Sequence, residues 1–166
     1  MNPDQILREQ LIALLNFGNA HSGIDHIVAG FPEEHFNAIP PNMEYTPWHL
    51  LEHIRIAQWD ILEFVRNPDH EPPPWPEGHW PQKDAKADAA TWQKTIDTIK
   101  ADLQEVQDIV TNPATDLYTD LPHAAGYNIL REALLVADHN AFHFGEFAIL
   151  RQVMLNWPVD RSKSSL

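Results

Sequence analysis

The sequence contains no cysteine among its 166 residues. This excludes disulfide bonds, thiolate metal ligands and a cysteine nucleophile, so any thiol used in a reaction has to arrive as a small molecule. Basic residues are also scarce: 11 lysines and arginines stand against 24 aspartates and glutamates, which gives a formal net charge of −13. Such a surface repels phosphate backbones, and we therefore expect no nucleic-acid partner.

Long apolar runs are missing as well. No segment approaches the roughly 20 apolar residues that a membrane-spanning helix needs, and no basic amphipathic face is suited to anionic membranes. The N-terminal sequence MNPDQILREQ has no apolar secretory core. We therefore expect no membrane association and a cytoplasmic protein. The length fits one domain, which we place over residues 1–166.

Helical periodicity is the main feature that the sequence does contain. Apolar residues recur at helical spacing in four segments, at about residues 3–17, 47–67, 85–110 and 128–156. Thr46 is a suitable N-cap for the second segment, and Pro47 suits its first turn. A short helix also fits residues 25–29, and no pair of strands is evident. The pattern predicts an all-α fold, a four-helix bundle.

Proline concentrates in the stretch NPDHEPPPWPEGHWPQ, residues 67–82, which holds six of the 14 prolines. A proline in each of these positions excludes a regular helix or a central strand. Trp75 and Trp80 are large aromatic side chains that normally bury against something. We expect an ordered loop that packs on the body of the domain.

The last helical segment carries polar residues on an apolar helix. Each residue advances by about 100°, so Glu132, His143 and Glu146 all fall within about 40° of His139. Unpartnered polar groups on a buried face are costly. His139 and His143 are four residues apart and can bind one metal ion; hydrogen-bonded core histidines are the alternative. Glu146 can be a ligand, an acceptor behind a ligand, or a base.

A third imidazole comes from the segment at 47–67, in the sequence HLLEHI. His53 lies at the edge of its apolar stripe, whereas His49 turns toward solvent and is expected at the surface. With the pair in the last helix, His53 completes three ligands with an open position, the pattern of a catalytic metal. Asp60 lies on the same side as His53. We expect it on a solvated flank, with a role behind a ligand or in an ion pair as the alternative.

The remaining histidines lie outside the long helices and are expected mostly at the surface: His21, His26, His35, His70, His79 and His123. His123 and Tyr127 directly precede the last helix and can overhang the site. The sequence does not decide their role, nor that of Glu132.

Three stretches carry a family resemblance: PWHLLEHIRIAQWDILEF, WPEGHWP and LREALLVADHNAFHFGEFAILRQ, with NAH at residues 19–21 as a weaker echo. In this order, covering most of the chain from residue 19 to 157, they resemble the DinB-like superfamily (DNA-damage-inducible protein B), the DinB/YfiT-like metalloenzymes. The resemblance implies an up-down-down-up four-helix bundle, often a homodimer. It also implies a divalent metal, typically nickel or zinc, held by His53, His139 and His143.

One position departs from the family pattern. Members commonly have Gly-Gln after the last ligand, where this chain has Gly145 and Glu146. Characterised relatives include thiol-dependent enzymes: maleylpyruvate isomerase, and S-transferases that use mycothiol or bacillithiol. We therefore expect a metal-dependent enzyme acting on a small-molecule substrate, a thiol S-transferase or a hydrolase, with Glu146 as the catalytic residue.

Two alternatives stand beside the enzyme. The first is a non-enzymatic, metal-binding, dimeric stress-related protein. The second is a di-metal carboxylate bundle, which needs paired Glu-x-x-His motifs that this chain lacks.

Overall fold

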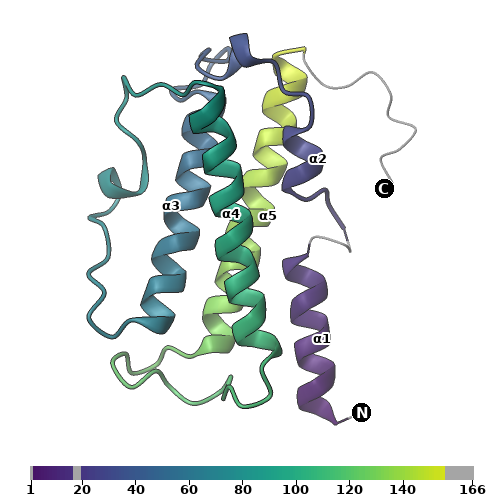
Figure 1. Ribbon diagram of the computed structural model, residues 1–166, viewed down its shortest axis with the longest axis vertical. Coiled ribbons are helices and arrows are strands. Elements are labelled where there is room, and N and C mark those ends of the chain that lie inside the picture. Colours follow the sequence, from purple (N-terminus) through teal and green to yellow (C-terminus); the bar gives the residue numbers. More distant parts are fainter. Residues whose placement is uncertain (1, 17–19, 156–166) are drawn as a thin grey trace.

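The structure is a computed structural model that describes residues 2–16 and 20–155 (Figure 1). The helices are α1 (Pro3–Leu15), α2 (Ile24–Val28), α3 (Pro47–Arg66), α4 (Ala89–Thr111) and α5 (Ile129–Val153), with short 3-10 turns η1 (Glu33–His35) and η2 (Glu77–His79). Within the described residues no β-strand forms, and Leu121 and Ala124 make an isolated bridge. The predicted all-α class is confirmed. The NAH echo at Asn19 and the predicted end of the last helix at residue 156 lie outside the described residues.

Side-chain caps fix where the helices begin. The Thr46 hydroxyl accepts a hydrogen bond from the His49 backbone N–H at 3.1 Å, and Pro47 occupies the first turn of α3. Asp88 caps α4 and Asn128 caps α5 in the same way. The cap at Asp88 explains why α4 begins four residues later than predicted, because the chain before a capping residue is not helical.

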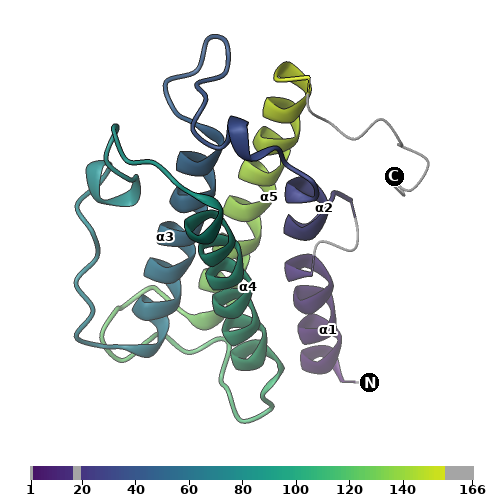
Figure 2. The same cartoon turned by 45° about the horizontal axis from the view of Figure 1, so that its top comes forward.

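The four long helices lie side by side, as Figures 1 and 2 show. α3 packs against both α4 and α5, and α1 packs against the same two helices from the other side. The side chains between them form one apolar core, in which the following are fully buried: Leu15, Leu50, Leu51, Ile54, Ile99, Val110, Phe147 and Leu150. No helix in the described part of the chain is long and apolar enough to cross a bilayer.

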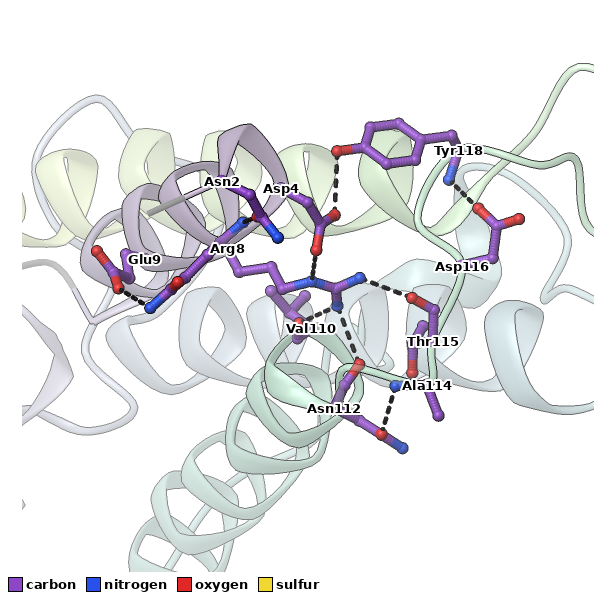
Figure 3. A network of polar contacts seen from close by, with 11 residues as sticks. Asn2, Asp4, Arg8, Glu9, Val110, Asn112, Ala114, Thr115, Asp116 and Tyr118 are labelled. Atoms are coloured by element: carbon purple, nitrogen blue, oxygen red, sulfur yellow. Dashed lines mark hydrogen bonds and ion pairs between the residues drawn. The ribbon is translucent and has the colours of Figure 1, made fainter.

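Arg8, near the middle of α1, joins this helix to the end of α4 and the segment that follows it (Figure 3). Its Nη1 donates to the carbonyl oxygens of Val110 at 2.6 Å and Asn112 at 3.0 Å, and its Nη2 donates to that of Thr115 at 2.7 Å. The Nε donates to Asp4 at 2.8 Å. The last carbonyls of a helix have no partner within the helix, so one guanidinium satisfies these acceptors and fixes the helix pair.

The segment between α3 and α4 runs back along the outer side of α3 in both views (Figures 1 and 2). Its turn η2 packs against α3. Trp80 is half-buried, as predicted for an anchor, but the prediction for Trp75 is wrong, because this side chain is 73% exposed. The ring of Trp75 meets that of His79 from outside, with 5.2 Å between the centroids.

Candidate metal centre

Three imidazole rings converge between α3 and α5. The Nε2 atom of His53 lies 3.1 Å from that of His143 and 3.3 Å from that of His139. All three ligand atoms lie within 4.8 Å of one another. His53 is buried, and the two rings from α5 are half-buried. The three residues selected by helical spacing are thus brought together, and nitrogen donors of this kind suit a divalent ion.

Hydrogen bonds at the far side of two rings determine which nitrogen carries the proton. The Nδ1 of His53 donates to the carbonyl oxygen of His79 at 2.7 Å. The Nδ1 of His143 donates to Glu146 Oε2 at 2.7 Å. A neutral imidazole with its proton on Nδ1 has a lone pair on Nε2. Two lone pairs therefore face each other across 3.1 Å, an arrangement that a cation between them stabilises.

Burial keeps the rings of His53 and His139 neutral at pH 7. It lowers the pKa of His53 to about 4, and the neighbouring His143 and His79 act in the same direction. It also lowers the pKa of His139 to about 4, again with help from the adjacent imidazoles. A neutral imidazole is the form that binds a metal. These two rings can therefore accept an ion without first losing a proton.

Glu146 is engaged at both carboxylate oxygens. Oε2 accepts from His143, and Oε1 accepts from the hydroxyl of Tyr45. Burial raises the pKa of Glu146, but these two hydrogen bonds outweigh it and the pKa is lowered. Sequence reasoning missed Tyr45, because it precedes α3 and lies 101 residues from its partner. No periodicity brings a loop residue to a helix so far along the chain.

Aromatic rings surround the group. Trp80 stacks on His53 with 4.1 Å between the ring centroids and 2° between the planes. Tyr45 lies against Trp80 at 5.2 Å, and Phe142 meets the edge of His143 at 4.9 Å. The rings restrict the orientation of the imidazoles and give the neighbourhood of the group an apolar character.

His49 is not at the surface, and that prediction is wrong. Its side chain is buried; Nδ1 accepts from the Thr46 backbone N–H at 3.5 Å and Nε2 donates to the Ala85 carbonyl oxygen at 2.9 Å. The capping interaction draws the ring toward the start of α3, where the chain before α4 covers it. Neither nitrogen is free to join the other three histidines.

The prediction of a solvated flank for Asp60 is also wrong, because two histidines donate hydrogen bonds to its carboxylate. Its Oδ1 accepts from His70 Nε2 at 2.6 Å and its Oδ2 from His79 Nε2 at 3.2 Å. His79 is buried, contrary to the surface position expected for it, and the side chain of His70 is only 7% exposed. Both belong to the proline-rich segment, which no helical period describes.

Other polar residues lie away from the group. Glu132 shares the face of His139 but is buried two turns earlier, where it pairs with Arg131 and lines a small apolar cavity. His123 donates to the carbonyl oxygen of Phe64, at the far end of α3 from His53, and Tyr127 packs on the same phenylalanine. These two residues do not overhang the group. His26 is exposed, as expected, whereas His21 and His35 are half-buried.

Comparison with known proteins gives one match. The family model described as DinB superfamily matches residues 16–147, a range that includes all three converging histidines. No curated protein and no solved structure matches the chain significantly.

Proposed function

The chain belongs to the DinB superfamily, and on this premise we propose that it is a divalent-metal-dependent enzyme. His53, His139 and His143 would hold the ion, which we expect to be nickel or zinc. The observation that carries the proposal is the pair of Nε2 lone pairs 3.1 Å apart, each set by a hydrogen bond behind its ring. Metal-binding histidines characteristically donate their other N–H to a carbonyl or a carboxylate, which is the arrangement of His53 and His143 here.

When bound, such an ion lowers the pKa of a thiol or a water at its open position and so supplies a nucleophile near neutral pH. Because the chain has no cysteine, the thiol would be a small molecule. We propose thiol S-transfer to a small electrophile as the reaction. The thiol sulfur would bond to the electrophilic carbon, the leaving group would depart with its electron pair, and the thiol proton would need an acceptor.

Glu146 is the carboxylate that we propose for catalysis. Its hydrogen bond from His143 Nδ1 supports a role in orienting that ring. To accept the thiol proton, Oε1 would first have to lose its hydrogen bond from Tyr45. The two roles lead to different expectations for the Glu146→Gln variant.

We also propose a homodimer formed through the outer face of α5. Leu135, Phe142 and Ile149 repeat at seven-residue spacing on that face and are 38%, 69% and 60% exposed. Such a stripe on the longest helix suits a second copy of the same helix. We expect Ile149→Glu to halve the mass measured by light scattering. Ile6→Glu, a similar change on exposed α1, should leave the mass unchanged; a wild-type monomer would contradict the proposal.

We also propose the order in which the four long helices run. In Figure 1, α1 and α5 run upward while α3 and α4 run downward, which supports the up-down-down-up order. We propose that residues 1–166 form one such domain.

The test uses protein purified without a histidine tag. Elemental analysis establishes the bound ion, and the loaded protein is then assayed with a panel of low-molecular-weight thiols and electrophiles. We expect turnover that requires the ion and disappears in His139→Ala. Metal-dependent stability without turnover across a broad panel would instead favour the non-enzymatic binding protein.

A further inference from the structure

We infer that Asp60 is a positioning residue for the metal centre, because it fixes the loop segment that orients His53. The inference rests on the proposed metal site and concerns a residue that touches none of the three histidines. It assigns the proline-rich segment, residues 67–82, to the site as a structural part of it.

The orientation of His53 depends on two consecutive loop residues. The carbonyl oxygen of His79 accepts the Nδ1 proton at 2.7 Å, and the indole of Trp80 lies flat on the imidazole with its centroid 4.1 Å away. The hydrogen bond sets the tautomer, and the stacked ring restricts rotation about the side chain. Both contacts come from the loop, so the direction of the Nε2 lone pair follows the position of residues 79 and 80.

Asp60 holds this loop at two points. It lies seven residues after His53 on α3, about 10 Å along the helix axis. Oδ1 accepts from His70 and Oδ2 from His79, so one carboxylate joins the outgoing and the returning parts of the loop. The three side chains are only 7% to 18% exposed. Shielding from solvent strengthens such charge-assisted hydrogen bonds.

Only one nitrogen of the His79 imidazole makes a hydrogen bond in the described part of the chain, and its acceptor is Asp60. Nε2 donates to the carboxylate, whereas Nδ1 is buried and has no hydrogen-bond partner in the described part of the chain. Among the described residues, Asp60 therefore accepts the one hydrogen bond that this imidazole makes, beside the contact of the ring with Trp75. Removing the carboxylate loosens the side chain of the residue whose carbonyl oxygen fixes His53.

The turn before His79 is rigid enough to transmit a displacement. The Gly78 N–H donates to the carbonyl oxygen of Pro74 at 2.7 Å. A Cβ on Gly78 would lie 2.7 Å from the Cβ of Pro73 and 2.8 Å from the Cδ of Pro74. Such close packing leaves the turn little room to deform. A displacement of the His79 side chain is therefore passed on to the backbone of the turn.

The matched comparison is Asp60→Ala against Glu63→Ala. Glu63 lies one turn further along α3 and pairs with Arg66, so both variants remove one carboxylate from the same helix. Zn²⁺ affinity is measured by chelator competition, and the ligand geometry by the visible spectrum of the Co²⁺-loaded protein. We expect Asp60→Ala to weaken Zn²⁺ binding roughly tenfold, as for partners behind metal ligands, and to change the Co²⁺ spectrum. Glu63→Ala should shift the affinity by less than about twofold and leave the spectrum unchanged.

A double-mutant cycle tests the route through His79. His79→Ala removes the imidazole but keeps the main-chain carbonyl. If Asp60 acts through this ring, the double variant should bind Zn²⁺ no more weakly than the weaker single variant. Additive losses would overturn the inference. If Asp60→Ala loses helicity, Asp60→Asn is used in its place, because asparagine keeps the side-chain volume and one acceptor oxygen. We expect its loss of Zn²⁺ affinity to be intermediate.

The outcomes separate this inference from the proposed enzyme. Wild-type protein that binds Zn²⁺ without turnover, with Asp60→Ala binding it more weakly, overturns the enzyme and keeps the inference. Equal Zn²⁺ affinity in wild type, Asp60→Ala and Glu63→Ala overturns the inference alone. Wild-type protein that binds no divalent ion overturns both.

Discussion

Two polar clusters connect distant parts of this chain, and they differ in how their donors and acceptors match. At one end of the bundle, Arg8 offers N–H groups to the Asp4 carboxylate and to carbonyl oxygens at the end of α4 (Figure 3). At the histidine cluster, the Nε2 atoms of His53 and His143 face each other, and the Nδ1–H of each ring donates to an acceptor behind it. The first cluster is complete within the protein. The second needs a positive charge to be satisfied.

The difference separates a structural joint from a binding site, although both are partly buried and polar. A network in which every donor meets an acceptor contributes to folding. A group of convergent acceptors stabilises the fold poorly on its own but binds a cation. The following experiments test this contrast.

The largest effect is expected for His139→Ala. Removing one of three ligands should weaken divalent-ion binding by more than the roughly 10–100-fold that losing a partner behind a ligand costs. Isothermal titration with Zn²⁺ measures this. His123→Ala, which removes a histidine bonded to the Phe64 carbonyl, should bind as wild type. Equal affinity for the two variants would contradict the metal centre.

Arg8→Ala should have the opposite profile. The loss of several charge-assisted hydrogen bonds to helix-end carbonyls is expected to lower the free energy of unfolding by about 3 kcal/mol, with little change in ion affinity. Urea denaturation of the ion-free protein measures this. Arg66→Ala is the control, because this arginine and its partner Glu105 are exposed and surface ion pairs contribute at most about 1 kcal/mol. Equal losses in the two variants would show that Arg8 is not a joint.

Glu146→Gln distinguishes the two roles of this carboxylate. If Glu146 orients His143, the variant should weaken ion binding by roughly tenfold. If it accepts a proton, ion binding should persist while turnover is lost at saturating metal. Tyr45→Phe is the companion change, since it frees Oε1 and leaves the His143 contact in place.

The last prediction concerns the stability of the ion-free protein in acid. The pKa values of His53 and His139 are lowered to about 4 from an ordinary value of 6.5. Between those values the unfolded chain binds more protons than the folded one, so the stability of the ion-free protein falls as the pH drops from 6.5 toward 4. The Asp4 carboxylate differs from these rings, because its hydrogen bond from Arg8 lowers its pKa from the ordinary value. Thermal unfolding should show a shallower acid slope in His139→Ala; an unchanged slope would contradict the assignment.

Helical periodicity predicted those residues of the site whose positions depend on the helices alone. His139 and His143 share a face because they are four residues apart, and His53 follows from its place beside the apolar stripe of α3. The same reasoning misplaced His49, whose ring is held by capping hydrogen bonds at the helix start. It also assigned Asp60 to solvent, because the loop that covers it has no period.

The partners behind the ligands show why the rest could not be predicted. Tyr45 reaches Glu146 across 101 residues. The acceptor for His53 is a main-chain oxygen, which every residue type carries and no sequence pattern marks. Such contacts depend on where a loop comes to rest, and that is decided only when the bundle has formed.

The stacking of Trp80 on His53 makes ion binding at the metal centre detectable by tryptophan fluorescence. An indole in van der Waals contact with an imidazole changes its emission when that ring gains positive charge or gives up electron density. Fluorescence of the unlabelled protein therefore reports whether the metal centre holds an ion. The control is Trp80→Phe, which lacks this one of the six tryptophans and should show no such change.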